Sequence, residues 1–125
     1  MASSCYIRWH VLTTEMYITN HARIRLKERC GLPKKAHKRN VSNALLKGIK
    51  YDECSGNLKW YLDTLFLSHR NGNNIRIYIN YVYIFNHSLL VTVLTLPNNY
   101  KAAVNKIIRK RRNFYYALNE LKIVS

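Results

Sequence analysis

The sequence predicts an α+β fold, with two N-terminal helices, an antiparallel β-sheet meander and a basic C-terminal helix, and with the helices on one face of the sheet. Two helical patterns near the N-terminus each end at a glycine, three apolar strand patterns follow, and a further helical pattern closes the chain. With 125 residues, 48% of them hydrophobic, the chain can form one small core. We expect residues 1–16 to be an N-terminal extension and residues 17–125 to be a single domain.

The first expected helix covers about residues 21–30. Thr19 or Asn20 can cap its N-terminus, because a short polar side chain there accepts a hydrogen bond from a free backbone N–H. Gly31 suits the C-terminal stop, and Pro33 prevents the helix from continuing.

Further helical patterns lie before and after the expected strands. The second helix, about residues 34–47, stops at Gly48, and a basic C-terminal helix covers about residues 100–119. Residues 57–68 place leucines at helical spacing, but the aromatic residues of the same segment favour a strand. Both interpretations of that segment stay open.

Three strands are expected in the second half of the chain. Isoleucines alternate with other residues from 75 to 79, which is the period-2 pattern of a half-buried strand. Short turns then separate residues 82–85 from residues 89–96, and the last segment is apolar on both sides. Arg76 and Tyr78 fall opposite the isoleucines, so we expect them on an open face of the sheet that is able to bind phosphate and stack bases.

The chain is strongly basic, with 21 Lys+Arg, 6 Asp+Glu and a formal net charge of +15. Such an excess favours a polyanionic partner, and RNA is the leading candidate. Other nucleic acids, a nucleoprotein and an acidic protein, such as an antitoxin or a host protein, are the further candidates. Solvated helix faces and ordinary aromatic packing are the alternatives. The expected nucleic-acid-binding residues are Lys34, Lys35, Lys38, Arg39, Tyr78, Tyr83, Arg109, Lys110, Arg111 and Arg112.

Several classes of protein are disfavoured. Cys5, Cys30 and Cys54 lack metal-ligand spacing and are expected to be reduced, as in an intracellular protein. No apolar run approaches the ~20 residues that span a bilayer, and no secretory signal is evident, so we expect a cytoplasmic protein without a membrane partner. Phosphate-binding glycine loops, nucleophile elbows and paired carboxylates are missing from the sequence, and no metal or cofactor is expected.

One group of residues is suited to RNA cleavage without a metal. That chemistry needs groups for two proton transfers and cations for the phosphorane charge. His21, Arg25 and Arg29 provide these types at one-turn intervals on one face of the first helix. Arg76 and the hydroxyl of Thr92 are the further catalytic candidates. The alternative is an exposed histidine beside solvated arginines, and the same surface role is expected for His37.

The order His21-Ala22-x-x-Arg25-x-x-x-Arg29, followed by a helix and by hairpins that end in a hydroxyl-bearing apolar strand, resembles small RelE-like domains. The resemblance covers about residues 17–97. Such domains are common on phages, plasmids and other mobile elements. They belong to a broad group of metal-independent RNases that includes RelE-type toxins, barnase-like enzymes and colicin tRNases.

The resemblance implies a groove between the sheet and the N-terminal helix that cleaves or binds RNA. Two functions are expected, and the further alternative is a small structural or interaction protein whose charge is incidental to its role. The first is a metal-independent endoribonuclease, toxin-like or a phage effector, and the alternative is a non-catalytic nucleic-acid-binding protein, such as a regulator or an inhibitor of a host nucleoprotein defence. A groove that His21 shares with arginines would support catalysis, whereas exposure on a convex helix would not. The residues that match the family pattern by position are His21, Arg25, Arg29 and Thr92, and Arg76 is added from strand alternation.

Overall fold

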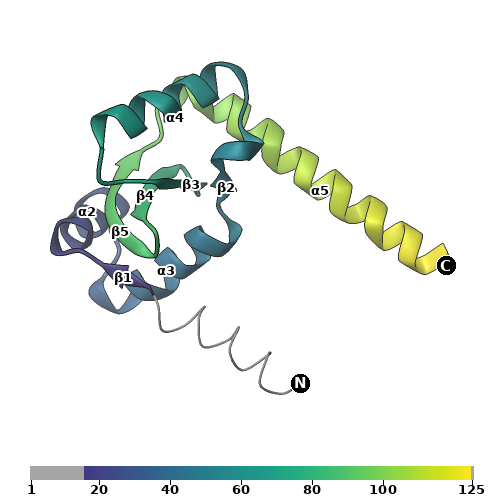
Figure 1. Cartoon of the computed structure of the whole chain (residues 1–125). Helices are drawn as coiled ribbons and strands as arrows, with labels where there is room; N and C mark the ends of the chain where they lie inside the picture. Colours follow the sequence, from purple (N-terminus) through teal and green to yellow (C-terminus); the bar gives the residue numbers. More distant parts are fainter. Residues whose placement is uncertain (1–15, 125) are drawn as a thin grey trace.

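The computed structural model describes residues 16–124, with side chains described for residues 16–120. Apart from Met16, which is buried in the core, the expected N-terminal extension lies outside the described residues. The elements, labelled in Figure 1, are β1 (Tyr17–Ile18), α2 (Asn20–Cys30), α3 (Lys34–Lys47), β2 (Ile49–Lys50), η1 (Tyr51–Glu53), α4 (Gly56–Ser68), β3 (Asn74–Tyr78), β4 (Tyr81–Asn86), β5 (Leu89–Thr95), η2 (Asn98–Tyr100) and α5 (Lys101–Val124).

The strands form one five-stranded mixed sheet in the order β1-β5-β4-β3-β2. The expected meander is present, because β3 pairs antiparallel with β4 and β4 pairs antiparallel with β5. The expectation of a purely antiparallel sheet was wrong, since β1 joins β5 in parallel. Helix α4 also lies between the two N-terminal helices and the meander in the chain. The coarse α+β class therefore holds, and the detailed arrangement does not.

Helices cover both faces of the sheet, with α2 and α3 on one side and α4 on the other (Figure 1). Strand alternation divides the core accordingly. Ile75 and Ile77 pack in a cluster with Leu62 of α4, whereas Tyr83 and Phe85 pack in a second cluster with residues of α2 and α3. The expected open sheet face is therefore wrong, because α2 and α3 cover the face that carries Arg76, Tyr78 and Tyr83. The segment 57–68 forms α4, which covers the face of the isoleucines instead.

The cap of α2 is Thr19, which settles the choice between Thr19 and Asn20. Its hydroxyl accepts a hydrogen bond from the Ala22 N–H at 3.0 Å and donates one to the Val91 carbonyl at 3.2 Å. Gly31 ends the helix with a φ of 64°, a left-handed conformation that glycine adopts without steric strain. One side chain thus both starts α2 and joins it to β5.

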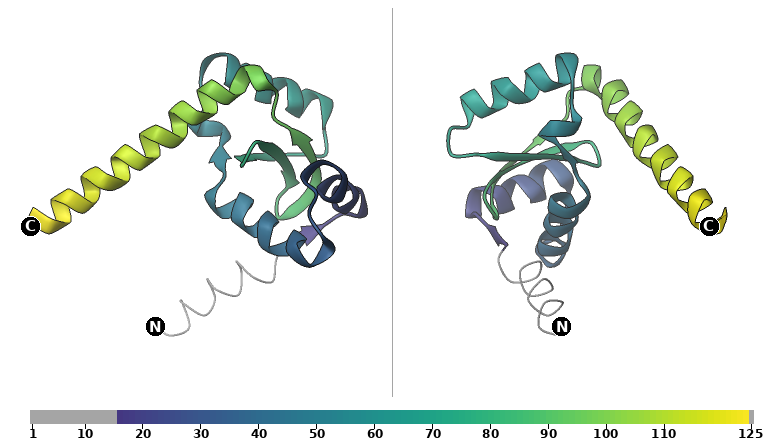
Figure 2. Two further views of the ribbon diagram at one scale, coloured as in Figure 1. Left: turned by 180° about the vertical axis from the view of Figure 1, so that it is seen from behind. Right: turned by 45° about the vertical axis from the view of Figure 1, so that its right-hand side comes forward.

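Helix α5 packs on the domain through its first turns alone (Figure 2). Val104 is 5% exposed and lies in the core, while every side chain from Arg112 to Leu118 is exposed. Figure 2 shows the remainder of the helix leaving the domain as a straight rod. No described helix combines the length and the apolar character that a bilayer crossing requires.

Candidate nucleic-acid interface

His21 and Arg25 are neighbours on α2, as their spacing predicts. The Arg25 Nε donates to the His21 Nε2 at 3.5 Å, and His21 is exposed. The Arg25 Nη1 also lies 3.4 Å from a carboxylate oxygen of Glu28, so Arg25 contacts His21 and forms an ion pair with Glu28 at the same time. The pair sits on a solvent-facing flank of the helix.

Arg29 joins α2 to the sheet instead of completing that pair. Its Nη1 donates to the Val93 carbonyl at 2.7 Å, and its own carbonyl accepts from the Tyr81 hydroxyl at 2.9 Å. These bonds fix the C-terminal end of α2 over β5 and β4. A structural role therefore accounts for the position of Arg29.

Arg76 and Thr92 lie apart from His21 and from each other. Arg76 donates to the Leu45 carbonyl at 3.2 Å, and this bond anchors α3 to β3. It also donates to the Asn74 side chain within β3. Burial lowers the pKa of its guanidinium. Thr92 is buried and pairs with Ile84 of β4. The Ile84 side chain belongs to the cluster under α4, on the sheet face that points away from α2 and α3. The structure does not assemble the predicted catalytic residues in one groove, because strand parity places Thr92 on the other side of the sheet from α2.

The two tyrosines expected to stack bases belong to the core. Tyr83 is 1% exposed, its hydroxyl accepts from the Asn40 side chain at 3.1 Å, and burial raises its pKa. Tyr78 is half-buried and packs against Tyr83 at 6.4 Å between ring centroids. The prediction that Tyr83 binds nucleic acid was wrong, because α3 covers its face of the sheet.

A groove of about 610 Å³ lies between α2 and the start of α3. Its cations are Arg23, Lys27 and Lys34, and Ile24, which is 54% exposed, contributes apolar surface. The lining set also includes Asn20, Pro33 and His37, and it contains no acid. The surface of the groove is mainly apolar, and the three cations are among the residues that line it. Such a groove is suited to bases, with phosphates bound by the cations.

His37 fixes one wall of this groove and is 3% exposed, so its expected surface position was wrong. Its Nε2 lies 2.9 Å from the Leu32 carbonyl, and its Nδ1 lies 3.4 Å from the Arg23 Nη1. A carbonyl can only accept and an arginine can only donate, so a neutral ring with its proton on Nε2 satisfies both contacts. His37 shares a helical face with Val41 and Ala44, and this spacing was the sequence signal for burial.

Lys35, Lys38 and Arg39 continue the basic surface along α3, where all three are exposed. They have no ion-pair partner among the described residues. The predicted phosphate-binding role of Lys34, Lys35, Lys38 and Arg39 is therefore compatible with their placement, and it stays a prediction.

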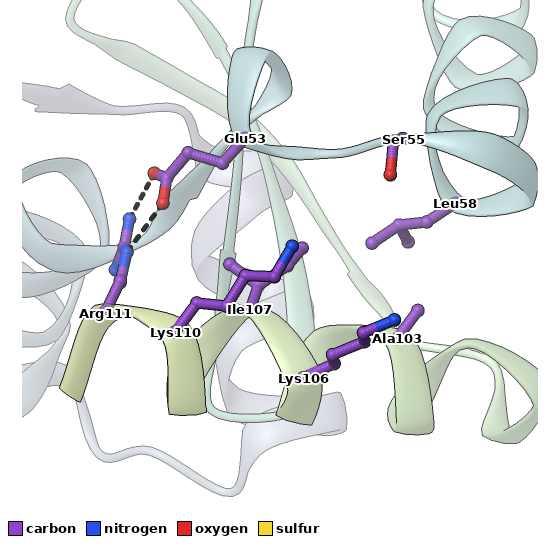
Figure 3. A pocket seen from close by; sticks show the side chains of 8 residues that line it. All are labelled: Glu53, Ser55, Leu58, Ala103, Lys106, Ile107, Lys110 and Arg111. Carbon is purple, nitrogen blue, oxygen red and sulfur yellow. Dashed lines mark hydrogen bonds and ion pairs between the residues drawn. The ribbon is translucent and has the colours of Figure 1, made fainter. Parts of the chain in front are cut away.

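A second hollow of about 410 Å³ lies between α5 and the segment that leads into α4 (Figure 3). Lys106 and Lys110 extend toward it, and Glu53 and Arg111 are paired at its edge (Figure 3). The Arg111 guanidinium binds both carboxylate oxygens of Glu53 and donates to the Lys47 carbonyl at 2.7 Å. Arg111 therefore holds α5 to the domain, and its expected place among the phosphate-binding residues needs correction. Arg109, Lys110 and Arg112 remain exposed.

Glu53→Gln is expected to lower the melting temperature at neutral pH and to leave it nearly unchanged in acid. The Arg111 hydrogen bond holds the Glu53 pKa below its ordinary value of 4.5. A depressed carboxyl pKa contributes stability above the unfolded value, and the contribution is lost as pH falls through the folded pKa. The pair is partly exposed, so we expect about 1 kcal/mol, or about 4 °C, at pH 7. Thermal melts from pH 7 to about pH 3 test this, with Asp52→Asn as the control, and an equal loss at every pH would contradict it.

The fold and these surfaces define a small mixed α/β domain with a basic groove between two helices. Comparisons with protein-family models, with curated proteins and with solved structures found no match. Among the described residues, no group of three or more His, Cys, Asp or Glu side chains could hold a metal ion. The resemblance to RelE-like domains stays a prediction from the sequence, and function has to be inferred from the geometry.

Proposed function

We propose that this chain is an RNA-binding protein and that the groove between α2 and α3 holds a segment of the nucleic acid. The groove itself is the observation that carries the proposal. Three cations surround an exposed apolar patch, and no acid lines the same space. Phosphates would lie against Arg23, Lys27 and Lys34, and a base would contact Ile24.

The basic surface extends beyond the groove. On α3, the exposed cations Lys35, Lys38 and Arg39 follow the groove residue Lys34 within five residues. Arg109 and Arg112 are exposed on α5. Cations of this kind bind phosphates without reading sequence, and they release counterions on binding. Sequence preference is therefore expected to be weak.

Binding is favoured over cleavage by the position of His21. A general base has to lie within hydrogen-bond reach of the proton it removes, in a site that also holds the phosphate. His21 instead lies on an exposed flank of α2 beside an arginine shared with Glu28, outside the residues that line the groove. RNA cleavage in EDTA that His21→Ala abolishes would overturn this choice and support the endoribonuclease.

The double variant Lys27→Gln with Lys34→Gln is expected to bind a single-stranded RNA about 10-fold more weakly than the wild type near 0.1 M salt, because two phosphate contacts are lost. Fluorescence anisotropy with a labelled RNA measures the affinity. Lys59→Gln on α4 is the control, because it removes one positive charge on the opposite side of the sheet. An equal loss of affinity per charge in the control would show that the net charge, and not the groove, is responsible.

A further inference from the structure

The hollow between α5 and the segment that leads into α4 has the size and the lining of a small-molecule site (Figure 3). Its volume of about 410 Å³ falls within the range of ~300–1,000 Å³ that is common for ligand pockets. Leu58, Ala103 and Ile107 supply its apolar surface. Ala103 and Ile107 pack against the core cluster that contains Leu58, so the fold holds this apolar wall in place.

Two lysines of α5 extend toward the same hollow (Figure 3). Lys106 and Lys110 are four residues apart, so they share one side of the helix, where two like charges repel each other. Both are exposed, and neither belongs to the ion pairs found in the described part of the chain. The hollow therefore receives two positive charges that no described carboxylate neutralises.

Glu53 lies at the edge of the hollow, and its charge is already compensated. The Arg111 guanidinium binds both of its carboxylate oxygens, and the Lys50 backbone N–H donates to Oε1 at 3.1 Å. Ser55 lies across the hollow from α5, and its hydroxyl makes no capping hydrogen bond to α4 (Figure 3). Three cations and one acid line the hollow, which leaves an excess of two positive charges beside a free hydroxyl.

We propose that this hollow binds a phosphate monoester, with the phosphate held by Lys106, Lys110 and the Ser55 hydroxyl. A phosphate monoester carries about −1.5 to −2 charges at pH 7 and has three strong acceptor oxygens, which suits two ammonium groups and a hydroxyl. A phosphodiester within an RNA strand carries a single charge. The organic part of the ligand would lie against the wall formed by Leu58 and Ile107.

Two kinds of ligand present this group: a free nucleoside monophosphate and the 5′-terminal nucleotide of an RNA. The site is separate from the groove between α2 and α3, because α4 covers the other face of the sheet. Binding of a free mononucleotide here therefore does not depend on the proposed RNA groove.

Titration of the full chain with adenosine 5′-monophosphate, followed by NMR, tests the site. The backbone amide signals of Ser55 and Ala103 are expected to shift, because both residues line the hollow. Adenosine at the same concentrations should cause no comparable shift, since it lacks the phosphate. Absence of a shift with the monophosphate up to ~10 mM would overturn the proposal, and so would an equal shift with adenosine.

The lysines are tested by the double variant Lys106→Gln with Lys110→Gln. Its affinity for adenosine 5′-monophosphate is expected to fall at least ~10-fold, since two charge-assisted hydrogen bonds are lost. Lys59→Gln with Lys101→Gln is the matched control, because it removes two positive charges from α4 and α5 at positions outside the lining of the hollow. An equal loss in the control, or an unchanged affinity in the first variant, would overturn the proposal.

Two RNA oligonucleotides of one sequence, one with a 5′-phosphate and one with a 5′-hydroxyl, distinguish the two ligands. Tighter binding of the 5′-phosphate form that the Lys106→Gln, Lys110→Gln variant abolishes would assign the site to the end of an RNA. Equal binding of both forms, together with binding of the monophosphate, would assign it to a free mononucleotide. The variant Lys27→Gln with Lys34→Gln should still bind the monophosphate, so a failure of the groove and a failure of this site can be told apart.

Discussion

A chain that ends at Asn98 is expected to lose its cooperative thermal transition, whereas a chain that ends at Arg112 should melt close to the full-length temperature. The first truncation removes Val104 and Ile107, which pack against the sheet and α4, and it removes the Arg111 pair with Glu53. Burial of one Val or Ile side chain stabilises a fold by about 1.5–3 kcal/mol. Losses of this kind are large against a total stability of about 5–15 kcal/mol.

Of the side chains that the structure describes beyond Arg112, those from Asn113 to Leu118 are exposed, and the second truncation leaves the core residues Val104 and Ile107 and the Arg111 contacts in place. Calorimetry of both chains at the same concentration measures the difference. Val104→Ala in the full chain is a milder control and is expected to lose about 2 kcal/mol. A chain ending at Asn98 that melts cooperatively at the wild-type temperature would show that the first turns of α5 are dispensable.

The long periodic elements of this fold were predictable from sequence. Alternating isoleucines predicted β3, and an apolar run between two turns predicted β5. The edge strands β1 and β2 were missed because each has two residues, too few to show alternation. Their pairing depends on neighbours that the chain brings together only after folding.

The layer arrangement was missed for a different reason. The segment 57–68 carried both helical and strand signals, and only the helix supplies a second covering layer. The apolar character of β5 on both sides already indicated burial on both faces. With both faces covered, Tyr83 and Thr92 become core residues on opposite sides of the sheet.

The candidate site was predictable in part. Helical spacing correctly placed Arg25 beside His21, because that relation is local. The groove depends on the relative orientation of α2 and α3 after the turn at Gly31, and no short sequence pattern predicts that orientation. Arg23 and Lys27, four residues apart on α2, were the available signal for its basic wall.

RNA affinity is expected to fall about 10²-fold when salt rises from about 50 to about 200 mM. If the three groove cations, Lys35 and Lys38 each bind one phosphate, as proposed, the complex has about five phosphate contacts. Each contact to a single strand contributes about −0.7 to the slope of log K against log salt. The slope near −3.5, multiplied by the change of ~0.6 in log salt, gives that factor. Lys27→Gln should make the slope shallower by about 0.7, because one contact is lost, while Lys59→Gln should leave it unchanged. Anisotropy titrations at four or more salt concentrations measure the slopes. An affinity that does not change with salt would exclude phosphate-driven binding, and it would remove the physical basis for assigning RNA to this groove.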